Sequence, residues 1–229
     1  MHSWKKKLML IAFCVAIFGC TDIQVHEGRK TDTSIGANEK ISFILDRSTI
    51  KDVEDAQRIE IKIEGCIDKA LKKLDPPVQT VSAEIFRKTV FPDMDYLSVP
   101  SSPDSIMDLL NNPEFKNRIN LLGLRYLLVL QSQYSSTNEI IGGCIGGGAA
   151  AACLVFLVWN NETKMSVCVI DLAKDCNAGE VKAEAVGHPW VGIVLIFPLG
   201  IPAFSEGPAC NALGKQVANF IVGNRQKQK

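Results

Sequence analysis

The chain has 229 residues, with 25 lysines and arginines balanced by 25 aspartates and glutamates. Loss of Lys5, Lys6 and Lys7 with the leader described below leaves 22 basic against 25 acidic residues, a net charge of −3. A chain without a basic surplus is not expected to bind nucleic acid. About 210 residues remain, which is enough to bury a sizeable core in one domain.

Residues 1–19 have the pattern of a secretory leader. Three lysines precede the apolar run Leu8–Phe18, which is shorter than the roughly 20 residues of a membrane-spanning helix. Ile17–Cys20 resembles the lipobox of bacterial lipoproteins, which implies cleavage before Cys20 and acylation of its sulfur. The alternative is a cleaved signal beside an ordinary cysteine. Several acyl chains would anchor the chain firmly to the lipid bilayer, and Thr21 resembles the sorting residue of outer-membrane lipoproteins that face the periplasm.

The segment after the leader is polar and then becomes periodic. Residues 20–39 lack any period, and we expect a flexible tether to a single domain at 40–222. Alternating residues predict a short strand at 41–45. From Val53 to Leu74, apolar residues recur every three or four positions, which predicts an amphipathic helix packed on a sheet. Asp75-Pro76-Pro77 ends it, because proline cannot continue a helix.

Three shorter helices are predicted next, each from its start signal. Ser82 is expected to cap a helix that ends before Pro92. Ser102-Pro103 and Asn112-Pro113 each combine a capping side chain with a proline in the first turn. Gly123 is expected to end the third of these helices in a left-handed conformation.

An apolar strand and an ambiguous segment follow. Leu124–Leu130 is apolar on both faces, which indicates a central strand. Residues 140–159 carry no charge and include five glycines. Their length permits a membrane-spanning helix, but glycine is a poor helix former. We therefore favour a glycine-rich hairpin tip at 142–152 within an insert at 139–153, followed by a strand at 153–159.

The C-terminal third predicts more strands and a closing helix. Alternation predicts strands at 165–170 and 181–186. Residues 190–204 are apolar but interrupted by prolines, which excludes a regular helix, and we expect this segment to cover a sheet edge or contact the membrane. Ser205 is expected to cap a last amphipathic helix, and residues 223–229 form a polar tail.

Six cysteines remain after the leader and its lipidation site. In an oxidising envelope compartment they are expected to form disulfides, with buried free thiols as the alternative. Proximity along the chain favours two local pairs, which leaves the two cysteines on the inward stripes of the first and last helices for each other. A zinc site is not expected, because no C-x-x-C pair is present. The three expected disulfide pairs are Cys144 with Cys153, Cys168 with Cys176, and Cys66 with Cys210.

This order of elements predicts an α+β fold, with a mixed, mostly antiparallel sheet and amphipathic helices packed on one face. The run from Gly123–Leu127 through Ser166–Leu172 and Gly179–Val181 to the final helix resembles envelope lipoproteins of the curli-secretion (CsgG) and penicillin-binding-protein-activator type. The resemblance implies a fold like the N-terminal domain of TolB.

Catalytic patterns are sparse in this sequence. His188 lies in Gly187-His188-Pro189 without a nucleophile elbow nearby, and Asp93 and Asp95 form a close carboxylate pair in a predicted loop. We therefore expect no enzyme activity, no cofactor and no metal. The predicted function is a binding or scaffolding module for an envelope protein partner, with homo-oligomers as an option. The alternatives are a secretion or pore component that uses the apolar hairpin, or an unrecognised hydrolase.

Overall fold

The computed structural model describes residues 21–48, 50, 52–145, 152–194, 197–201 and 204–223. Contacts divide the chain into two compact units. The main unit contains Gln24–Gln133, Lys164–Ala183 and the chain from Ala209 onward. The second unit contains Tyr134–Thr163 and Glu184–Pro208, together with the chain up to Ile23.

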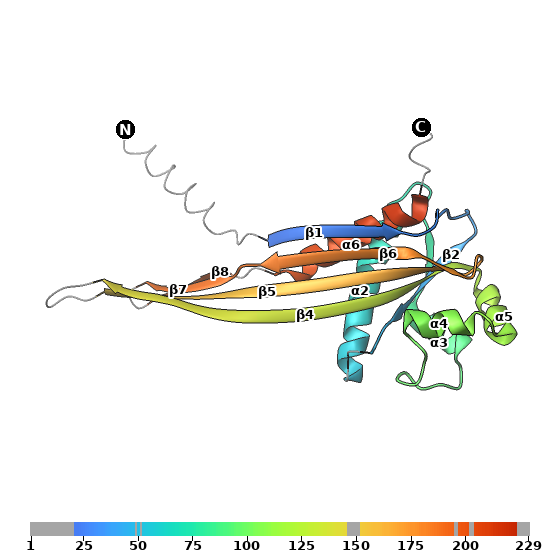
Figure 1. The fold of residues 1–229 in the computed structure, drawn as a ribbon, viewed down its shortest axis with the longest axis horizontal. Helices are drawn as coiled ribbons and strands as arrows, with labels where there is room; N and C mark the ends of the chain where they lie inside the picture. Colours follow the sequence, from blue (N-terminus) through green and yellow to red (C-terminus); the bar gives the residue numbers. More distant parts are fainter. Residues whose placement is uncertain are drawn as a thin grey trace. The chain divides into compact units, whose positions relative to one another are not determined.

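Six strands follow one another in the order β1-β6-β5-β4-β2-β3. Strand β2 pairs in parallel with both β3 and β4. The arrows of β4, β5 and β6 alternate in direction (Figure 1). The sheet is therefore mixed, as predicted. The strands are β1 (Thr21–Arg29), β2 (Lys40–Leu45), β3 (Gln79–Val81), β4 (Leu124–Ile145), β5 (Ala152–Asp171) and β6 (Cys176–Gly187).

The described helices begin and end close to the predicted signals. Ser82, Ser102 and Asn112 each accept a backbone N–H at the start of a helix, and Gly123 ends one with a φ of 67°. These are local rules of chain chemistry, so the sequence predicts them well. The helices are α2 (Val53–Leu71), α3 (Ala83–Val90), α4 (Pro103–Leu109), α5 (Pro113–Leu122) and α6 (Glu206–Val222).

The sheet of the main unit is buried on both faces. One core cluster joins α3, α4 and α5 to Leu127 and Val129 of β4. The alternate residues Tyr126, Leu128 and Leu130 are also fully buried, and they point to the opposite face, because side chains alternate along a strand. The inward stripes of α2 and α6, which lie outside that cluster, are completely buried as well. The α+β class is confirmed, with helices on both faces of the sheet instead of one.

Strand β1 occupies residues for which the sequence predicted a flexible tether. Its side chains are mostly exposed, so no apolar alternation announces the strand. Its place depends on backbone contacts with β6: the N–H of Lys30, just after β1, donates to Ala178 O at 2.9 Å. A Cβ built at Gly179 would lie 2.3 Å from Gly28 O. Only glycine permits so close an approach of two backbones.

The second unit contains the glycine-rich and apolar segments. Residues 140–145 lie in β4 and residues 152–159 lie in β5, its neighbour in the sheet. Of the tip expected at 142–152, residues 142–145 and 152 therefore belong to these strands, and residues 146–151 lie outside the described residues. Residues 190–201, for which the prolines excluded a regular helix, include β7 (Trp190–Val194) and β8 (Phe197–Ile201), which pair in antiparallel register. Strand β7 also pairs with β5. Among the helices that the structure describes, none has the length and apolar character needed to cross a membrane.

Candidate functional site

A cleft of about 660 Å³ opens between α2, α3 and the loop at 91–99, all within the main unit. Small-molecule binding pockets typically have volumes of about 300–1,000 Å³. The lining combines acidic, basic, aromatic and apolar side chains. These residues are Gln57, Glu60, Ile61, Glu64, Gly65 and Asp68 of α2, Ser82, Ala83, Glu84, Arg87 and Lys88 at α3, and Phe91, Pro92, Met94, Tyr96 and Val99 of the loop.

The start of α3 is fixed against α2 by two acceptors. The Ser82 hydroxyl accepts the N–H of Ile85 at 3.3 Å, and the Glu64 carboxylate of α2 accepts the N–H of Ala83 at 3.2 Å. The first N–H groups of a helix have no partner inside the helix and favour negative charge. Glu64 therefore holds one wall of the cleft to the other.

A buried ion pair forms the floor of the cleft. Glu60 is only 3% exposed; its carboxylate accepts the N–H of Leu45 at 3.0 Å and pairs with Arg87 Nη1. A buried carboxylate is tolerated when a cation and further hydrogen bonds satisfy its oxygens. Glu60 and Arg87 thus neutralise each other and tie α2 to both β2 and α3.

The loop at 91–99 is held by two arginines around one aromatic ring. The guanidinium carbons of Arg47 and Arg87 each lie 4.6 Å from the centroid of the Tyr96 ring, and Arg47 Nη2 donates to Val99 O. Burial lowers the pKa of Arg47 and raises the pKa of Tyr96. Within the described part of the chain, Nε and Nη1 of Arg47 are buried and make no hydrogen bond.

Glu64 differs from the other acids of the cleft in lacking a cation. Asp68 pairs with Lys72 at 2.7 Å and Glu84 pairs with Lys88 at 2.6 Å. Among the described residues, no basic group lies within ion-pair distance of Glu64. Burial raises the pKa of the Glu64 carboxyl and outweighs the hydrogen bond from the N–H of Ala83, which lowers it. The carboxylates of Glu60 and Asp68 raise this pKa further, and the charge of Arg87 lowers it.

The exposed lining of the cleft combines apolar side chains with Gln57 and the ion pair of Glu84 with Lys88. Ile61 of α2 is 71% exposed and Met94 of the loop is 50% exposed. Gly65 lies between the acidic positions of α2, and a Cβ placed on it would meet no atom within 4 Å. The cleft therefore offers a half-buried carboxylate that has no ion-pair partner among the described residues, open space beside it, and two exposed apolar side chains, Ile61 and Met94. Such a lining suits a cation attached to an apolar body.

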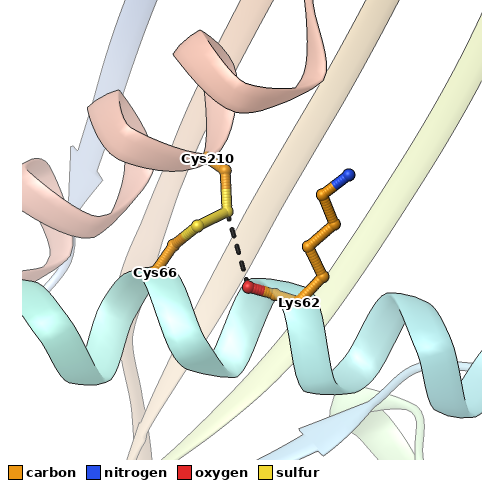
Figure 2. The surroundings of a disulfide bond; sticks show 3 residues. All are labelled: Lys62, Cys66 and Cys210. Atoms are coloured by element: carbon orange, nitrogen blue, oxygen red, sulfur yellow. Dashed lines mark hydrogen bonds between the residues drawn. A yellow bond between two sulfur atoms is a disulfide. The ribbon is translucent and has the colours of Figure 1, made fainter.

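The predicted disulfide between Cys66 and Cys210 is confirmed. It joins α2 to α6 with a Cα–Cα distance of 5.8 Å across 144 residues of sequence. Figure 2 shows the bond between the two facing helices, with the carbonyl of Lys62 beside it. Cys210 Sγ lies 3.6 Å from Lys62 O; a bonded sulfur carries no proton, so this is a packing contact.

The other predicted cysteine roles have different outcomes. Cys168 and Cys176 are free thiols, so their predicted pairing is wrong. Cys168 lies three residues before the end of β5 whereas Cys176 begins β6, so the hairpin does not place them opposite each other. Burial raises the pKa of Cys168 to about 11. The side chains of Cys144 and Cys153, and the whole of Cys20, lie outside the described residues.

The candidate catalytic residues lie outside the cleft lining. His188 is exposed, and its Nδ1 lies 2.8 Å from Asn160 Oδ1 in the second unit. Asp95 Oδ1 accepts the N–H groups of Leu97 and Ser98, and these hydrogen bonds, that of Ser98 first, lower its pKa. Asp95 thus stabilises a turn, and Asp93 is exposed beside it. In the described ranges, no group of three or more potential metal-ligating side chains comes together.

The sequence reasoning missed the cleft because its parts are distant in the chain. Glu60 and Glu64 are four residues apart on α2, a spacing that places them on the same side of a helix and was a usable signal. Arg47 and Tyr96 gave no usable signal, because a single arginine and a single tyrosine in predicted loops form no distinctive sequence pattern.

Comparisons with known proteins give no family. No protein-family model matches the chain, and no curated protein matches it. A dodecamer of a PelC variant from Paraburkholderia phytofirmans is 9% identical, covers 90% of this chain and 99% of its own, with a TM-score of 0.34. A putative neuraminyllactose-binding hemagglutinin homolog from Helicobacter pylori is 7% identical, with 89% and 94% covered and a TM-score of 0.34. At these TM-scores neither likeness supports a conclusion about fold or function.

Proposed function

We propose that this protein is a membrane-anchored lipoprotein of the bacterial envelope that works by binding a partner protein. The disulfide between Cys66 and Cys210 is the observation that carries the proposal, because such bonds persist in the periplasm and are rare in the cytosol. The leader at 1–19 supplies the route of export, and Cys20 supplies the acylated anchor.

The outer membrane is the proposed location, with the folded domain facing the periplasm. Thr21, the residue after the acylated cysteine, supports this choice, as does the resemblance to curli-secretion and penicillin-binding-protein-activator lipoproteins. With β1 beginning at Thr21, the folded part of the chain starts directly after the anchor.

Binding, without turnover, is the proposed mode of action. The cleft between α2 and α3 supports it, because its acids and bases are engaged in pairs or caps that hold the walls together. Ser82 is the serine of the cleft lining, and its hydroxyl already accepts the N–H of Ile85. A cleft of this composition can hold a ligand by charge and apolar contact.

The anchor is tested by mass spectrometry of the mature N-terminus and by membrane fractionation. We expect an acylated Cys20 at the first position and recovery of the protein with the outer membrane. The variant Cys20→Ala should retain its leader and should not appear in the outer-membrane fraction, while Cys176→Ala, a change in a free thiol, should behave as the original. A mature chain that begins at Thr21, or an unmodified Cys20, would refute the proposal.

A further inference from the structure

We propose that the cleft between α2 and α3 binds a basic segment of a partner protein, whose lysine or arginine pairs with Glu64 and whose flanking apolar residues contact Ile61 and Met94. This inference rests on the proposed binding function and deepens it by assigning the surface and the chemistry of the partner. It does not depend on the lipid anchor.

The charges of the cleft favour a cation. The two arginines beside the cleft are held in the fold: Arg87 is neutralised by Glu60, and Arg47 lies against Tyr96 and donates to Val99 O through Nη2. Among the described residues, the Nε and Nη1 groups of Arg47 make no hydrogen bond. Among the described residues, Glu64 forms no ion pair: one of its oxygens accepts the N–H of Ala83, and the charge of Arg87 acts on it without an ion-pair contact. An ammonium or guanidinium group brought to the other oxygen would relieve the repulsion from neighbouring carboxylates and form a charge-assisted hydrogen bond.

The shape of the cleft favours a side chain with an apolar body. Gly65 leaves room one residue away from Glu64, so a long side chain can lie across α2 to reach the carboxylate. Lysine and arginine carry three or four methylenes that pack on apolar surface while the charge is paired. Exposed Ile61 and Met94 then extend the contact to residues next to the cation, which a free small cation cannot use.

The test uses peptide mixtures and the full chain as cells process it, purified in detergent. Each hexapeptide has arginine at its third position and random leucine, isoleucine, valine or phenylalanine elsewhere. A matched mixture has citrulline, the uncharged analogue of arginine, and a third has glutamate. We expect the arginine mixture to bind roughly tenfold more tightly than the citrulline mixture by fluorescence anisotropy, with weakening as salt rises.

Two variants locate the binding in the cleft, each with a matched control. Glu64→Gln keeps an acceptor for the N–H of Ala83 and should abolish the preference for arginine over citrulline; Glu54→Gln, on the exposed first turn of α2, should not. Gly65→Trp should fill the cleft and abolish binding of both mixtures. Gly207→Trp, at an exposed helical glycine with equally open surroundings, should leave binding unchanged. Circular dichroism confirms that each variant is folded.

Three results would overturn the proposal. These are equal affinity for arginine and citrulline mixtures, tighter binding of the glutamate mixture, and binding of free spermidine with no binding of the arginine mixture, which would make the cleft a small-cation site. An unmodified Cys20 together with an intact arginine preference would instead refute the anchor and leave the cleft assignment standing. The two proposals therefore fail separately.

Discussion

Removal of the disulfide between α2 and α6 should have the largest effect on stability. The double variant Cys66→Ala, Cys210→Ala opens a loop whose ends are 144 residues apart in sequence. In the chain-entropy model, closing a loop of that length lowers the entropy of the unfolded chain enough to stabilise the fold by about 5 kcal/mol. Cys210 is fully buried, so the small space left by its sulfur adds a packing loss.

Urea unfolding of the mature chain, followed by circular dichroism, measures this prediction. We expect the free energy of unfolding to fall by several kcal/mol in the double variant, and the original protein to fall by a similar amount after reduction. Cys176→Ala is the control, because its free thiol closes no loop. A loss below about 1 kcal/mol, or an equal loss in the control, would show that the bond does not restrain the unfolded chain as argued.

Three further predictions follow from single residues. Gly65→Ala should raise the free energy of unfolding by up to about 1 kcal/mol, because alanine is the better helix former. Gly214→Ala should lower it by about 1–3 kcal/mol, because the added Cβ would lie 2.7 Å from Cys66 O. Urea unfolding that gives both variants a change of the same sign would contradict this prediction. Burial raises the pKa of Cys168 to about 11, so at pH 8 its thiol is ionised in roughly one molecule per thousand. Iodoacetamide should therefore leave Cys168 unmodified in the folded chain and modify it in urea. Equal rates of alkylation in the two conditions, measured by peptide mapping, would refute the assigned burial. Burial raises the pKa of Glu64, so the folded state binds this proton more tightly than the unfolded state does. The free energy of unfolding should therefore fall as pH rises from the unfolded-state pKa to the folded-state pKa, and level off above it. Glu64→Gln should remove that decline, and parallel curves of stability against pH for the variant and the original would contradict the prediction.

Local signals in the sequence were sufficient for the helices and for the buried strand. Ser82, Asn112 and Gly123 lie where the helices start or end, since capping depends on bonds between residues two to four positions apart. The apolar strand at 124–130 was identifiable because a strand buried on both faces reads as a continuous apolar run. The pairing of Cys66 with Cys210 followed from their inward positions on two amphipathic helices.

Only the tertiary structure decided the features that join distant or polar segments. Strand β1 is held by backbone contacts to β6 and exposes its side chains, so no apolar period predicts it. The free state of Cys168 depends on hairpin register, which proximity along the chain does not reveal. The cleft forms because Glu64 meets Ala83 nineteen residues later and Arg47 meets a tyrosine forty-nine residues later. Contacts between residues so far apart in the sequence form only when the chain packs, and local sequence patterns do not predict them.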